Sequence, residues 1–113
     1  MAMSPSLLIA GCGDVGGRLA SRLLNQRWRV HGLRRSISDL PQGVLPVAGD
    51  LAQSQCPPDW PVGPLDYLVY CAAANESSAA GYRAAYVEGL RHVLGWLREH
   101  GQMPRRVLCV SST

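Results

Sequence analysis

The stretch LLIAGCGDVG at residues 7–16 decides the fold. Its first four residues are apolar and predict a short, buried strand over residues 6–10. Three glycines follow at the spacing GxGxxG, and the residues from 14 to 26 then keep a rough helical period. A strand that passes through a glycine-rich turn into a helix is typical of the first unit of a doubly wound parallel sheet.

Each glycine has its own physical role in such a turn. Gly11 can take backbone angles that other residues resist, Gly13 has no Cβ and so lets an anion approach the main chain, and Gly16 lets the helix pack closely on the strand. The free N–H groups at the helix start and the helix dipole both favour negative charge. The pattern therefore predicts a site for a dinucleotide's pyrophosphate, and the alternative is a turn that binds nothing. The residues expected to form this site are Gly11, Cys12, Gly13, Asp14, Val15 and Gly16.

The rest of the chain alternates between strand and helix patterns. Further strands are predicted over 28–33, 44–48, 65–71 and 106–110, and a long helix over 78–100 is ended by Gly101. Residues 34–43 suit a loop or a frayed helix, and the prolines between 52 and 64 exclude a regular element there. This alternation predicts an α/β fold, a Rossmann-type doubly wound parallel sheet of strand order 3-2-1-4-5, in a single domain over residues 1–113.

The long helix is expected to turn an apolar stripe toward the sheet. Its members are Tyr82, Tyr86, Leu90, Val93, Leu94 and Leu97. For Trp96 a place in the core is favoured over a role as an interface anchor. The opposite face is charged and is expected to be solvated.

Composition excludes several classes of function. The net charge is only +3, all eleven basic residues are arginine, and no arginine run with interleaved aromatics suggests nucleic-acid binding. No apolar run of about 20 residues could span a membrane, and no signal peptide is apparent. The four cysteines lack metal-ligand spacing, which predicts no metal site and is typical of a reducing cytoplasm.

The end of the second strand bears on which nucleotide binds. A binder of the non-phosphorylated cofactor carries an acidic residue about 20 residues after the first glycine, but residues 31–36 here contain no carboxylate. Arg34, Arg35 and Ser36 instead suit a 2′-phosphate, since arginine binds phosphate in a bidentate, charge-assisted way. NADP is therefore favoured over NAD, unless both arginines are simply surface residues.

Two later strand ends complete the expected cofactor site. Asp50 and Leu51 follow the third strand, where the Asp50 carboxylate could accept a hydrogen bond from an adenine amine or could equally hold a turn. Ala72 and Ala73 follow the fourth strand, where small residues would let the cofactor approach the backbone, although the alanines could also be only a tight connection.

Taken together, these segments resemble the short-chain dehydrogenase/reductase superfamily, and more narrowly its extended and atypical NAD(P)-dependent epimerase/dehydratases. The resemblance rests on IAGCGDVG (9–16), GLRRS (32–36), GDL (49–51), VYCAA (69–73), YVEGLR (86–91) and VSST (110–113). It implies reversible hydride transfer at a carbinol carbon, with Ser112 as part of the catalytic site. The resemblance also makes a homodimer possible, since extended members often dimerise through helices that include the one at 78–100.

Two features depart from the pattern of that family. Most members have one more residue in the first gap of the glycine turn, and extended members usually carry asparagine where Tyr86 stands. The family's catalytic Tyr-x-x-x-Lys is also absent, because these 113 residues contain no lysine.

We therefore expect the NADP-binding portion of a longer enzyme. It would be truncated before the sixth strand, without the substrate region and inactive alone. The alternatives are a stand-alone dinucleotide-sensing regulatory module and a structural remnant that binds nothing.

Overall fold

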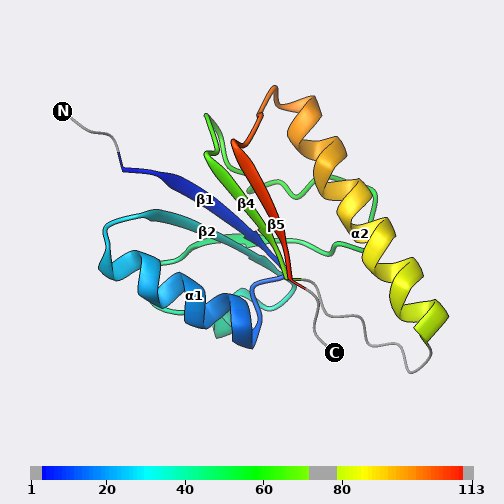
Figure 1. The fold of residues 1–113 in the computed structure, drawn as a ribbon, viewed down its shortest axis with the longest axis horizontal. Helices are drawn as coiled ribbons and strands as arrows, with labels where there is room; N and C mark the ends of the chain where they lie inside the picture. The colour runs from blue at the N-terminus through cyan, green and yellow to red at the C-terminus, as the bar shows by residue number, and fades with distance from the viewer. Residues whose placement is uncertain (1–3, 72–78, 111–113) are drawn as a thin grey trace.

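The computed structural model describes residues 4–71 and 79–110. A five-stranded parallel sheet lies between two helices (Figure 1). The strands are β1 (Ser6–Ala10), β2 (Arg29–Arg34), β3 (Leu45–Ala48), β4 (Tyr67–Tyr70) and β5 (Arg106–Cys109). Their order is β3-β2-β1-β4-β5, with every pairing parallel. The prediction of a Rossmann-like α/β sheet is confirmed, together with its strand order.

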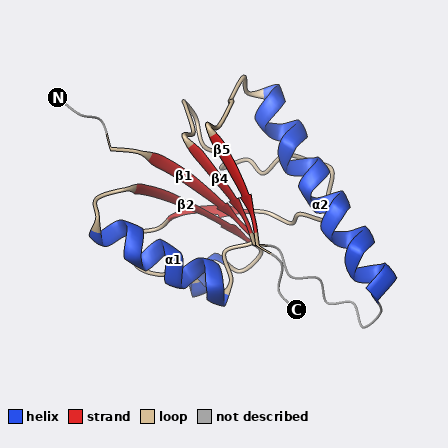
Figure 2. Ribbon diagram, viewed as in Figure 1, coloured by secondary structure: helices blue, strands red, loops and turns tan. Residues whose placement is uncertain are grey.

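The helices cover opposite faces of this sheet. Helix α1 (Asp14–Asn25) lies on one face and α2 (Ala79–Glu99) on the other, as Figure 2 shows. A short 3₁₀ helix, η1 (Ile37–Asp39), lies between β2 and β3, where the sequence favoured a loop or a frayed helix. Gly101 ends α2 with a φ of +64°, as the sequence predicted.

Because all strands are parallel, their carboxyl ends meet at one edge of the sheet. In Figure 1 the strand arrows converge at this edge, and the chain turns there from β1 into the start of α1. Central β1 pairs with β2 on one side and with β4 on the other. The glycine turn therefore lies where the crossovers diverge to opposite faces, which is where open α/β sheets bind their ligands.

Alternation along the strands divides the core into two layers. In β1, Leu7 and Ile9 face α1, whereas Leu8 and Ala10 face α2. Side chains of successive strand residues point to opposite faces, so β1 can be buried along its whole length. Burial on both sides explains why its sequence reads as an unbroken apolar run.

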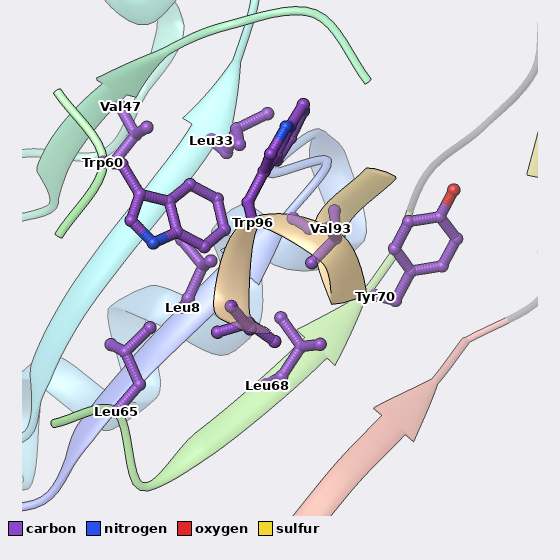
Figure 3. Packing of buried hydrophobic residues seen from close by; sticks show 11 residues of the cluster. Leu8, Leu33, Val47, Trp60, Leu65, Leu68, Tyr70, Val93 and Trp96 are labelled. Carbon is purple, nitrogen blue, oxygen red and sulfur yellow. The ribbon is translucent and has the colours of Figure 1, made fainter. Parts of the chain in front are cut away.

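Two tryptophans dominate the layer beneath α2. Trp96 of α2 is buried and meets Trp60 edge to face, with ring centroids 5.5 Å apart (Figure 3). Its indole Nε1 donates to the Ser54 carbonyl at 3.1 Å. The core interpretation of Trp96 is thus confirmed. Leu94 was expected on the inner stripe but is 43% exposed, because the buried face of α2 is formed by Val93, Trp96 and Leu97 and Leu94 lies outside it.

Gln102 makes three hydrogen bonds to the proline-rich connection before β4. Its Oε1 accepts from Trp60 Nε1 at 2.8 Å, and its Nε2 donates to the carbonyls of Pro61 and Gly63 at 2.9 and 2.7 Å. Gln102 is itself buried, so these bonds satisfy an amide that would otherwise be costly to bury. A loop with few N–H donors of its own thereby obtains a fixed shape.

Strand β5 differs from the other four because all its residues are exposed. Leu108 is 56% exposed, and Cys109 is also open to solvent. Within the described residues β5 pairs with β4 alone. One edge of the sheet therefore presents apolar side chains and free backbone groups.

His31, in the middle of β2, makes the stability of the fold depend on pH. Burial lowers the pKa of His31 below its usual 6.5, and the charge of Arg29 lowers this pKa further. The unfolded chain then binds a proton more readily than the native one, so the free energy of unfolding falls as the pH drops below about 6.5. In urea melts from pH 8 to 5, His31→Gln should reduce this loss. An unchanged pH dependence would contradict the assignment.

Candidate functional site

The glycine turn is attached to the end of β2. The N–H groups of Gly11 and Cys12 both donate to the Leu33 carbonyl, at 3.0 and 2.9 Å. Gly11 has a φ of +84°, a left-handed conformation that favours glycine. The tight turn predicted for Gly11 is therefore present, and it places the first turn of α1 beside Arg34.

Helix α1 begins with unpaired donors. Gly13 is its N-cap and offers no side-chain acceptor, and the first helical bond runs from the Gly17 N–H to the Gly13 carbonyl at 2.8 Å. Within residues 4–71 and 79–110, no protein group accepts from the N–H of Asp14, Val15 or Gly16. Three donors and the positive end of the helix dipole are thus available to an anion.

Gly13 and Gly16 have opposite surroundings. A Cβ built on Gly13 would meet nothing within 4 Å, so this side of the turn is open. A Cβ on Gly16 would lie 2.9 Å from Ile9 Cγ2, too close to be accommodated without a shift. Gly16 is therefore required for helix–strand packing, and Gly13 leaves space in front of the donors.

Cys12 contributes only its backbone to the open side of the turn. Cys12 was expected among the site residues, but its side chain is fully buried in the layer beneath α1, so its thiol does not face the open side of the turn. Burial raises the pKa of Cys12, although the nearby Arg34 charge opposes this shift. A buried thiol with a raised pKa is unsuited to redox sensing. The Cys12 carbonyl remains accessible to Arg34.

Val15 was expected among the residues of the site, and its side chain is open to solvent. The residue is 55% exposed, on the first turn of the helix. Gly16 takes the inward position there, because a larger side chain would strike β1. Val15 thus leaves an apolar surface beside the free N–H groups.

Arg34 is held between the glycine turn and η1. Its Nη1 donates to the Cys12 carbonyl at 3.3 Å, and its Nη2 lies 3.7 Å from Asp39 Oδ2. The Arg34 side chain is 31% exposed. The sequence pointed to Arg34 but missed Asp39, which lies outside the residue window where an acidic partner was sought. Only the position of η1 reveals that this carboxylate faces the end of β2.

A hollow of about 470 Å³ lies between the first turns of α1 and η1. A second ion pair lies in its wall, with Arg18 Nη2 3.4 Å from Asp14 Oδ2. Arg35 and Ser36 are exposed outside the hollow, where the Ser36 hydroxyl lies 3.4 Å from that of Ser38. The lining consists of Gly13, Asp14, Gly17, Arg18, Ser21, Arg34, Asp39 and Pro41.

Asp50 and Leu51 follow β3 at the same edge of the sheet but do not line the hollow. The Asp50 carboxylate accepts from the Ala52 N–H at 2.9 Å and so holds a turn, which was one of its two expected roles. Leu51 is half-buried, and its carbonyl accepts from His92 Nδ1 of α2 at 2.6 Å. This loop is therefore attached to α2.

Three predicted site residues, Ala72, Ala73 and Ser112, lie outside the described residues. In the part of the chain that the structure describes, no group of three or more histidine, cysteine, aspartate or glutamate side chains could hold a metal ion. Neither described helix is long and apolar enough to cross a membrane.

Comparisons with known proteins show a similarity to solved structures. No protein-family model matches the chain, and no curated protein matches it. A solved structure from Methylobacillus flagellatus, named "putative NAD-dependent epimerase/dehydratase", is 36% identical with a TM-score of 0.69. The similarity covers 98% of this chain and 38% of that one, so the chain spans well under half the length of this neighbour.

Proposed function

We infer that this chain binds a nicotinamide dinucleotide at the carboxyl edge of its sheet. The observation that carries the inference is the set of three free N–H groups at the start of α1, in front of which Gly13 leaves open space. Such an arrangement suits a pyrophosphate, because the donors and the helix dipole both stabilise negative charge. The solved neighbour supports this choice of ligand, since it is named as NAD-dependent.

The residues around the glycine turn fit the adenosine half of that cofactor. The N–H groups of Asp14, Val15 and Gly16 would hold the pyrophosphate, and the hollow beside Arg34 would take the adenine ribose. When bound, the cofactor supplies hydride transfer. The chain's own part is to fix the phosphates and to orient the adenosine.

We further propose that the chain is the cofactor-binding portion of an oxidoreductase or of a sugar-nucleotide epimerase/dehydratase-like protein. The share of the neighbour that it spans supports this proposal. Without lysine, these 113 residues have no Tyr-x-x-x-Lys pair, so they should bind cofactor without turnover. Ser112 would contribute to a catalytic site that other residues complete.

Among the dinucleotides we propose a preference for NADP, carried by Arg34. Replacing Arg34 and Arg35 with alanine should weaken NADPH binding by roughly 30-fold or more, because charge-assisted bonds to phosphate are worth about 1.5–3 kcal/mol each. NADH affinity should change little. Isothermal titration calorimetry with both cofactors measures the difference.

The matched control for that experiment is the exposed pair Arg105 and Arg106. The double alanine variant there removes the same charge at the start of β5, away from the hollow, and should leave both affinities as in the wild type. An equal loss for NADPH and NADH at positions 34 and 35 would remove the preference for NADP.

The binding itself is tested by titrating folded wild-type chain with NADPH and NADH. Saturable binding of either cofactor supports the proposal. Absence of binding at millimolar cofactor would contradict it and would favour a structural remnant that binds nothing.

A further inference from the structure

The Asp39 carboxylate already pairs with the guanidinium of Arg34, on which the proposed preference for NADP depends. The Nη2 of Arg34 lies 3.7 Å from Asp39 Oδ2, and its Nη1 is engaged by the Cys12 carbonyl at 3.3 Å. Both ends of the fork therefore already face a protein oxygen. A phosphate that uses the fork in a bidentate way must compete with the carboxylate for Nη2.

The effect of Asp39 on affinity differs between the two cofactors. A 2′-phosphate carries a charge of about −1.5 to −2 at neutral pH, so it competes with the Asp39 carboxylate for the same Arg34 guanidinium. The 2′-hydroxyl of NAD is neutral and can donate a hydrogen bond to a carboxylate. Asp39 should therefore lower the affinity for NADP and not lower the affinity for NAD.

The position of Asp39 makes it suited to this role. It ends η1 and lines the same hollow as Arg34 and Gly13, while its side chain remains 62% exposed. Its backbone N–H donates to the Ser36 carbonyl at 3.3 Å, but apart from Arg34 no described side chain forms an ion pair with its carboxylate. The side chain can thus change without disturbing the fold.

The geometry points to Asp39 as a specificity-determining residue that limits the preference for NADP by competing with the 2′-phosphate for Arg34. This assignment rests on the proposed dinucleotide function. It predicts that the chain discriminates between the two cofactors less than Arg34 alone would allow. The carboxylate serves as the partner of Arg34 until a phosphate replaces it.

The test is Asp39→Asn, which keeps the shape of the side chain and removes its charge. NADPH should bind about tenfold more tightly to this variant, and NADH with equal or slightly lower affinity, as measured by calorimetry at fixed ionic strength. In an Arg34→Ala background the same substitution should change NADPH affinity by less than about threefold, because the group for which Asp39 competes is gone. Asp59→Asn removes the same charge from an exposed site outside the hollow and should alter neither affinity.

The outcomes separate this inference from the function on which it rests. A wild-type chain that binds neither cofactor refutes the dinucleotide function itself. If the wild type binds NADPH but Asp39→Asn has no effect or weakens binding, the role of Asp39 is refuted and the function stands. A similar tightening with and without Arg34 would show a general charge effect and would also overturn the competition.

Discussion

Replacing Gly13 with alanine is expected to weaken dinucleotide binding by on the order of 100-fold, with the fold intact. The added methyl group would lie in open space, so it meets no protein atom within 4 Å. It would, however, hold the pyrophosphate away from the N–H groups of the first helical turn. Each bond to a charged group is worth about 1.5–3 kcal/mol, so losing one or two gives an effect of this size. Calorimetry gives the affinity, and circular dichroism with urea melts gives the stability.

Gly16→Ala is the matched control, because it adds the same methyl group one helical turn away. There the methyl would press on Ile9 Cγ2 at 2.9 Å, and the expected result is a loss of about 1–3 kcal/mol in the free energy of unfolding. The two variants should thus separate binding from folding. Unchanged affinity in a folded Gly13→Ala chain would show that no phosphate approaches this turn.

Trp96→Ala is expected to have the largest effect on stability, a loss of about 3–5 kcal/mol in the free energy of unfolding. The indole is buried against Trp60, and its removal would leave a cavity beneath α2. It would also leave the Ser54 carbonyl without its donor. Since domains of this size are stable by only about 5–15 kcal/mol, the variant should melt at much lower urea concentration.

Leu94→Ala tests the same helix on its exposed side. Leu94 is partly solvated two residues before Trp96, so its truncation should cost less than about 1 kcal/mol. Comparable losses for the two variants would mean that α2 packs with a different face toward the sheet.

Most of the fold could be predicted because its signals are local. The apolar run of β1, the turn after it and the glycine that ends α2 each depend on neighbouring residues, and alternation of strands and helices fixes the strand order. Side-chain orientation in α2 was harder, since Leu94 and Trp96 are both apolar and only packing against Trp60 decides which is buried.

The site was predicted less completely, because its charges meet through space. Arg34 could be identified from its place after β2, but its partner Asp39 reaches it only through the turn of η1. Gly16 faces β1 while the neighbouring Val15 is exposed, and the rough helical period of residues 14–26 does not indicate this. Dinucleotide binding and the preference between NADPH and NADH stay predictions that calorimetric titration can decide.

The four thiols differ in burial, and this allows a single position of the molecule to be labelled selectively. Burial raises the pKa of Cys12, Cys56 and Cys71, whereas Cys109 is open to solvent on β5. Alkylating reagents attack an accessible thiolate, and the chain has no lysine side chain that could react in its place. A fluorophore or spin label can therefore be attached to the outer strand of the sheet in the wild-type sequence, where it would sense whatever comes to cover that strand.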